Sequence, residues 1–130
     1  MDIKIISGGQ TGADQGGLWA AYDLGILVGG MAPKNYRTED GPNRALLKDV
    51  FDLVESESES YDVRTFQNVH DSDGTIIFGN ASSSGSSKTI GYCNQLCKPK
   101  LIIQYNPDSR LDLTSVAATW IKDNNLRIIN

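Results

Sequence analysis

The stretch Ile5-Ile6-Ser7-Gly8-Gly9-Gln10-Thr11-Gly12-Ala13-Asp14 begins as an apolar run, becomes rich in glycine and leads into a helical pattern. The three glycines allow backbone N–H groups to approach an anion closely, and the positive end of the following helix dipole lies at the same place. The spacing matches neither the Walker motif nor a clean Gly-x-Gly-x-x-Gly pattern. It therefore predicts a phosphate-binding loop, with a tight strand-to-helix turn that holds no ligand as the alternative.

Short apolar runs recur along the chain and alternate with helical patterns. The runs that predict buried strands are 4–6, 26–28, 75–78, 100–104 and 127–129, and the helical patterns are 15–24, 43–54, 61–70, 88–97 and 114–124. Strands without strict polar alternation are typical of a parallel sheet covered on both faces. The sequence predicts the α/β class: one Rossmann-like, doubly wound domain over 1–130, with about five parallel strands.

Right-handed crossovers place the loops after parallel strands at one edge of the sheet. If the strands follow the order 2-1-3-4-5, the chain changes direction between the strands at 4–6 and 75–78. Loops 8–14 and 79–88 then flank a crevice where a ligand would bind. The candidate ligand-binding residues are Ser7, Gly8, Gly9, Gln10, Thr11, Gly12, Asp14, Gly30, Lys34, Arg37, Asn80, Ser82, Ser83, Ser84, Gly85, Ser86, Ser87, Lys88 and Thr89.

Several carboxylates keep acid–base catalysis open as an alternative to binding. These are Asp14, Glu39, Asp40, Asp71 and Asp73. The chain has no Gly-x-Ser-x-Gly motif and a single histidine, His70, which we expect to be exposed or to cap a turn. Cys93 and Cys97 are four residues apart and are expected to share a helix face as small hydrophobic residues.

The net charge of −4 and the pI of about 4.8 argue against a duplex nucleic-acid partner, which normally requires a basic surface. No leader pattern and no apolar run near the length of a membrane span is present, so we expect a cytoplasmic protein without a membrane partner. The segment 31–41 is expected to be a loop. The alternating Glu and Ser residues of 55–60 predict a solvated, mobile connector.

Several ordered blocks of the sequence resemble the molybdenum carrier family, part of the SLOG group of Rossmann-like nucleotide-binding domains. The blocks are Ile6 to Asp14, Gly29-Gly30, Pro33-Lys34, Glu39-Asp40-Gly41, Arg64-Thr65, Asn68-Val69 and Asp71-Ser72-Asp73. The resemblance implies a homo-oligomer, a dimer or tetramer, that holds a phosphate-bearing cofactor or nucleotide. A carrier role for molybdenum cofactor is proposed for some members of this family.

The departures from the pattern bear on the expected function. Similar sequences place an arginine after the aspartate, where this chain has Gln15. The related phosphoribohydrolases carry a glutamate after their second glycine loop, whereas Ile90-Gly91 follows Thr89 here. We therefore expect non-enzymatic binding of a nucleotide-like ligand, either molybdenum cofactor or a nucleotide-derived signal such as an ADP-ribose derivative, with no required cofactor or metal. The alternative is a nucleotide glycosidic- or phosphate-bond hydrolase or transferase.

Overall fold

The computed structural model describes residues 2–104, 108 and 112–130. Its central strands are β1 (Lys4–Ile6), β2 (Leu27–Gly29), β7 (Thr75–Phe78), β8 (Lys100–Ile103) and β9 (Ile128–Ile129). Among the described residues these match the five predicted strands to within one or two positions. All their pairings are parallel, which confirms the predicted α/β, Rossmann-like class.

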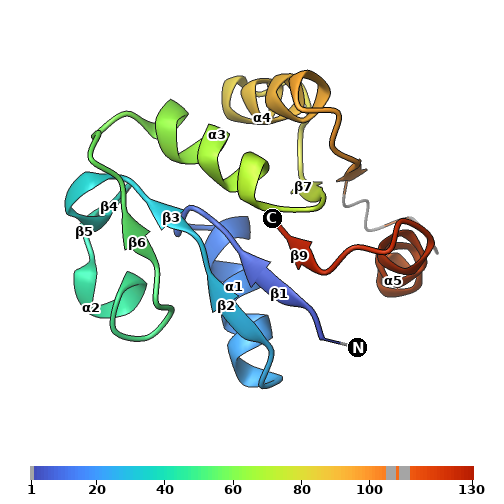
Figure 1. Cartoon of the computed structure of the whole chain (residues 1–130), viewed down its shortest axis with the longest axis horizontal. Helices are drawn as coiled ribbons and strands as arrows, with labels where there is room; N and C mark the ends of the chain where they lie inside the picture. Colours follow the sequence, from blue (N-terminus) through green and yellow to red (C-terminus); the bar gives the residue numbers. More distant parts are fainter. Residues whose placement is uncertain (1, 105–107, 109–111) are drawn as a thin grey trace.

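The order of the central strands differs from the expected one. β9 pairs with β1 on one side, and on the other side a parallel bridge joins Gly74 to Ile129 at the start of β7. Hydrogen bonds from Ile76 N to Asn130 O and from Asn130 N to Gly74 O, at 2.8 and 2.9 Å, extend this contact. The order is therefore β2-β1-β9-β7-β8, and the expected direct pairing of strands 4–6 and 75–78 was wrong. Figure 1 shows β9 between β1 and β7.

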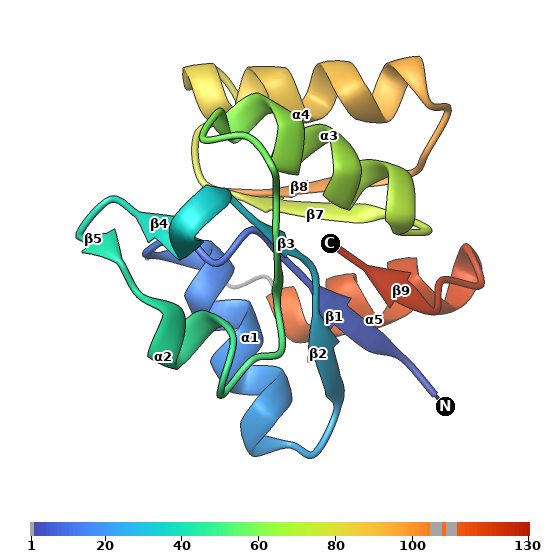
Figure 2. The same cartoon turned by 60° about the vertical axis from the view of Figure 1, so that its left-hand side comes forward.

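The long helices cover both faces of these strands. They are α1 (Ala13–Asp23), α3 (Tyr61–Asp71), α4 (Ser84–Gln95) and α5 (Leu113–Asp123). Figure 2 shows α3 and α4 on one side of β7 and β8, with α1 and α5 on the other. Each begins near its predicted start except α4, which begins four residues earlier, so that Ser84 to Ser87 form its first turn. The sequence also predicts a loop at 105–113, and most of that range lies outside the described residues.

Residues 31–55 form a small layer whose short strands the sequence did not predict. β3 (Met31–Ala32) pairs in parallel with β6 (Val54–Glu55), and β4 (Arg37–Thr38) pairs with β5 (Gly41–Pro42). The 3-10 helix η1 (Lys34–Tyr36) and α2 (Arg44–Leu47) complete it. Of the helix expected over 43–54, only Arg44–Leu47 is α-helical, so that prediction was wrong in part. The expected loop at 31–41 was therefore wrong in part.

The connector at 55–60 is also different from the expected solvated segment. Ser56 is buried, its N–H donates to Ala32 O at 2.7 Å, and Lys34 N donates to Ser58 O at 3.0 Å. Backbone pairing to β3 and η1 thus holds the segment in place despite its polar side chains.

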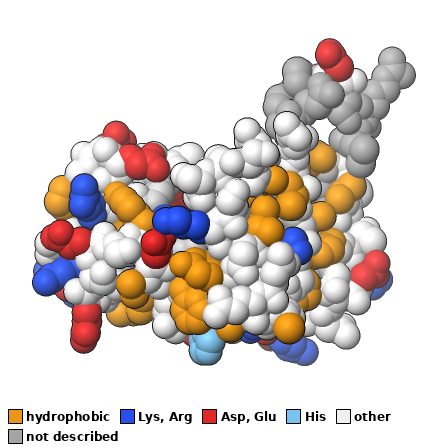
Figure 3. All heavy atoms as spheres, turned by 90° about the horizontal axis from the view of Figure 1, so that it is seen from above, with side chains coloured by type: hydrophobic (Ala, Val, Ile, Leu, Met, Phe, Trp, Pro, Cys, Tyr) orange, Lys and Arg blue, Asp and Glu red, His pale blue; other side chains and the backbone are white. Residues whose placement is uncertain are grey.

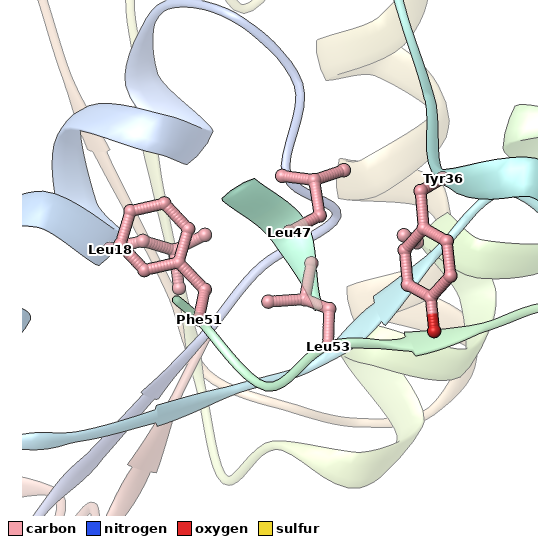
Figure 4. Close-up of a cluster of buried hydrophobic side chains, with 6 residues drawn as sticks. Leu18, Tyr36, Leu47, Phe51 and Leu53 are labelled. Atoms are coloured by element: carbon pink, nitrogen blue, oxygen red, sulfur yellow. The ribbon is translucent and has the colours of Figure 1, made fainter. Parts of the chain in front are cut away.

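A buried hydrophobic cluster attaches this layer to α1. Leu18, Ala32, Tyr36, Leu47, Phe51 and Leu53 form the cluster (Figure 4). The helical spacing predicts that Leu18, Trp19, Ala21 and Tyr22 form the inner face of α1, and of these Leu18 and Ala21 are buried. Trp19 and Tyr22 are 41% and 52% exposed and make edge-on ring contacts with Phe51, a correction to the expected inner stripe. The cluster matters for the site because it lies directly beneath the glycine loop.

The two cysteines do not share a helix face. Cys93 is buried in α4, whereas Cys97 lies beyond the end of that helix, is exposed and has a φ of 55°. The expectation for this pair was wrong because α4 ends at Gln95, before the second cysteine is reached.

Candidate functional site

A cavity of 690 Å³ opens where the two predicted loops meet at the carboxyl edge of the sheet. Its size is within the range of small-molecule sites. The lining includes Gln10, Thr11, Asp14, Ser83, Ser84, Gly85, Ser86, Lys88 and Thr89, all of them predicted site residues. Residues from α3 and β7 that the sequence did not single out as ligand contacts also line it, among them Tyr61, Asp62, Arg64, Thr65, Asn68, Thr75, Ile77 and Phe78. The structure thus brings the two loops to one cavity although β9 lies between their strands.

The remaining predicted residues lie outside the lining. They are Ser7, Gly8, Gly9, Gly12, Gly30, Lys34, Arg37, Asn80, Ser82 and Ser87. At Gly9 and Gly30, close packing of the fold explains why the residue is glycine. A Cβ on Gly9 would lie 2.8 Å from Leu47 Cδ2, and one on Gly30 would lie 2.3 Å from Ser7 O, with a φ of 123° at Gly30. These glycines allow close approaches within the fold beneath the cavity.

Gly8 makes room for an arginine. A Cβ at this position would lie 2.1 Å from Arg64 Nη1, so the guanidinium of α3 packs directly on the bare backbone of the loop. Arg64 Nη1 is 3.4 Å from Asp14 Oδ2, and the guanidinium also lies over the Tyr61 ring, 5.4 Å from its centroid. The guanidinium of Arg64, a residue of α3, therefore places a positive charge beside the loop that follows β1.

The glycine loop already surrounds a carboxylate of its own. Gln10 N donates to Asp14 Oδ2 at 3.2 Å, and Gly9 N donates to the Ser7 hydroxyl at 3.2 Å. Burial raises the pKa of Asp14 and Glu39 adds to this, whereas Arg64 and the N–H of Gln10 oppose it. Glu39 also accepts a hydrogen bond from the Thr11 hydroxyl. Two acidic side chains, those of Asp14 and Glu39, therefore lie at the start of α1.

The start of α4 differs from the start of α1 because it lacks acidic side chains. Its first turn contains no acidic residue, and Ser84, Gly85 and Ser86 all line the cavity. The Ser83 hydroxyl accepts from Ser86 N at 3.3 Å, which among the described residues leaves the N–H groups of Ser84 and Gly85 for a ligand or water. Since a helix N-terminus favours anions, this end of the cavity suits a phosphate better than the start of α1 does.

Across the mouth of the cavity, α3 and α4 are joined by an exposed ion pair. Lys88 Nζ lies 2.8 and 3.1 Å from the two carboxylate oxygens of Asp62. Figure 3 looks onto the side of these helices and shows Lys and Arg side chains interspersed with Asp and Glu. His70 is exposed beside Asp71 and lies outside the cavity lining.

Two of the candidate acids, Asp73 and Asp71, lie outside the cavity lining and form hydrogen bonds within the fold. Asp73 Oδ2 accepts from the N–H groups of Arg127 and Ile128 at 3.0 and 2.9 Å, which lowers the pKa of Asp73 and holds β9 in place. Asp71 pairs with His70 and Gln67 on the surface.

Within the described part of the chain, no three His, Cys, Asp or Glu side chains are grouped to hold a metal ion. None of the helices described is long and apolar enough to cross a membrane.

Comparisons with known proteins agree with the resemblance expected from the sequence. The sequence model of the Circularly permutated YpsA SLOG family matches residues 5–130. A crystal structure from Syntrophus aciditrophicus SB, described as a "Putative molybdenum carrier protein", is 35% identical with a TM-score of 0.85. That match covers 99% of this chain and 80% of the other. No curated protein matches the chain significantly.

Proposed function

We propose that this chain, which belongs to the Circularly permutated YpsA SLOG family, binds a phosphate-containing, nucleotide-like small molecule without consuming it. The observation that carries the proposal is the cavity, in which the first turn of α4 faces the wall formed by α1 and α3. The phosphate would lie at the N–H groups of Ser84 and Gly85, with Lys88 nearby. The rest of the ligand would extend toward Gln10 and Arg64.

The ligand is proposed at the level of its class. The name of the Syntrophus protein makes molybdenum cofactor one candidate, and a nucleotide-derived signal such as an ADP-ribose derivative is the other. Both carry phosphate. A homo-oligomer, a single domain over 1–130 and a cytoplasmic location remain predictions of the sequence and the resemblance.

Gly85 provides a direct test of the phosphate position. A Cβ at Gly85 would have no atom within 4 Å, so Gly85→Asp adds a negative charge without a clash. An acid in the first turn favours the helix but repels a phosphate, so we expect unchanged or higher stability and about tenfold or greater loss of affinity. Gly91→Asp, in the same helix and equally open, is the matched control and should retain affinity.

The ligand itself can be identified by mass spectrometry of the small molecule released when the purified protein is denatured. Isothermal titration with the released compound then measures affinity in the parent chain and both variants. Equal affinities for Gly85→Asp and Gly91→Asp would contradict the proposed phosphate position.

A hydrolase or transferase is the second candidate, because Asp14 combines a raised pKa with a position in the cavity wall. The protonated carboxyl could act as a general acid on a glycosidic oxygen. Incubation with nucleoside monophosphates and ADP-ribose compounds distinguishes the two functions. Recovery of unchanged ligand supports binding alone, and a product that is lost in Asp14→Asn supports catalysis.

A further inference from the structure

Two buried polar atoms in the cavity wall have no hydrogen-bond partner within the described residues. They are Gln10 Oε1 and Arg64 Nε. Gln10 is only 5% exposed, and the Arg64 side chain is 16% exposed. Buried polar groups in folded proteins are almost always satisfied, so an unpaired acceptor and an unpaired donor at one cavity point to a ligand that supplies both partners.

The surroundings of Gln10 fix which of its amide atoms is available. Its Nε2 donates to Gly8 O at 3.3 Å and to Arg37 O at 2.9 Å. Turning the amide over would place Oε1 against these two carbonyl oxygens, and both hydrogen bonds would be lost. The amide oxygen Oε1 of Gln10 is therefore the atom that remains to accept a hydrogen bond from a ligand.

Arg64 supplies the complementary donor. Guanidinium nitrogens only donate, and Nη1 already faces Asp14 Oδ2 at 3.4 Å. Both side chains rest on the same residue, because Gln10 Nε2 donates to Gly8 O and Arg64 packs where a Cβ of Gly8 would be. The acceptor and the donor thus both adjoin Gly8 in the cavity wall, where the Arg64 guanidinium lies over the Tyr61 ring.

We infer that Gln10 and Arg64 form a recognition subsite for a heterocycle that carries an N–H donor next to a hydrogen-bond acceptor on one edge. The inference rests on the proposed function, which places the phosphate of the same ligand at α4. The six-membered ring of an amino-purine or an oxo-purine has such an edge. A ring without the N–H leaves Gln10 Oε1 unpaired, and sites of this kind discriminate strongly against such analogues.

Four compounds test the subsite in the unmodified protein by isothermal titration. AMP offers an amino group next to a ring nitrogen, and IMP offers a ring N–H next to a carbonyl. Purine riboside 5′-monophosphate keeps the phosphate and the ring but lacks the N–H donor, and ribose 5-phosphate has no ring. We expect AMP or IMP to bind at least about tenfold more tightly than purine riboside 5′-monophosphate. The tighter of the two identifies the edge as amino or oxo.

Two arginine variants test the donor. Arg64→Lys keeps the positive charge and removes Nε, so the preferred nucleotide should lose about tenfold in affinity while ribose 5-phosphate keeps its affinity. Arg37→Lys is the matched control, because Arg37 also lies over the Tyr61 ring, at 5.9 Å, but outside the cavity lining. It should change neither affinity. A merely structural role of Arg64 would lower both.

The possible failures are distinguishable. Equal binding of AMP, IMP and purine riboside 5′-monophosphate overturns the subsite and leaves the phosphate proposal standing. An equal loss of nucleotide and ribose 5-phosphate affinity in Arg64→Lys also overturns it. If none of the four compounds binds, the subsite is overturned, and titration of the released compound into Gly85→Asp and Gly91→Asp decides the phosphate proposal separately.

Discussion

Gly8→Ala should disturb the site through one side chain, that of Arg64. The backbone of Gly8 is outside the left-handed region, so alanine can adopt it. The added Cβ would lie 2.1 Å from Arg64 Nη1 and 2.7 Å from Arg64 Cδ. Arginine is long and flexible, and the guanidinium should therefore swing into solvent and leave the loop in place.

The size of the effect follows from the contacts that Arg64 loses. Its partly buried ion pair with Asp14 contributes about 1 kcal/mol, and its position over the Tyr61 ring contributes about 0.5–1 kcal/mol. We therefore expect Gly8→Ala to lower the free energy of unfolding by about 1.5–2 kcal/mol. In an Arg64→Ala background the same substitution should have almost no effect, because the clashing atoms are gone.

Urea unfolding followed by circular dichroism, applied to the four proteins of this double-mutant cycle, measures the coupling directly. The expected coupling is the whole effect of Gly8→Ala. A substitution that destabilises both backgrounds equally would refute the reasoning, since it would show that the glycine serves the backbone and not the arginine.

Four further variants test the pH dependence of stability and the packing of the glycines. Because burial raises the folded-state pKa of Asp14, its stabilising contribution is present below the unfolded value near 3.8 and lost as the pH rises through the folded value. The parent chain should thus gain stability over Asp14→Asn as the pH falls toward 3.8, and a constant difference would contradict this. The lowered pKa of Asp73 has the opposite sign: its contribution is present above 3.8 and lost as the pH falls through the folded value. Asp73→Asn should therefore cost about 1–3 kcal/mol at pH 7, with little difference in strong acid, by urea unfolding. Gly16→Ala in open space within α1 should stabilise by about 0.5–1 kcal/mol, whereas Gly30→Ala, with its clash and positive φ, should destabilise by about 3 kcal/mol or more. Thermal unfolding that ranks these two glycine variants in the reverse order would show that the packing argument is wrong.

The local pattern of the sequence predicted where strands and helices lie but not how the strands are ordered. β9 consists of Ile128–Ile129 alone, and nothing in two isoleucines specifies their neighbours. Its place is set by long-range contacts, including the Asp73 carboxylate that accepts from the N–H groups of Arg127 and Ile128.

The candidate site was predictable at its two loops because glycine and serine clusters directly after buried strands have a clear signature. The cavity wall formed by α3 was not predictable, because a helical pattern does not indicate which face of the helix contacts a loop that is distant in sequence. Arg64 is 50 residues from Asp14 in sequence, and no local pattern indicates that the two side chains meet. Gln10 was named as a loop residue, but its unpaired Oε1 follows from a contact with Arg37 that no local pattern encodes.

We propose that the phosphate lies at the first turn of α4 and not at the glycine loop of α1. A titration of the preferred nucleotide followed by amide chemical shifts in nuclear magnetic resonance tests it residue by residue. The proposal predicts that the largest shifts occur at the N–H groups of Ser84 and Gly85. Shifts concentrated at Thr11, Gly12 and Ala13, with Ser84 and Gly85 unchanged, would contradict it.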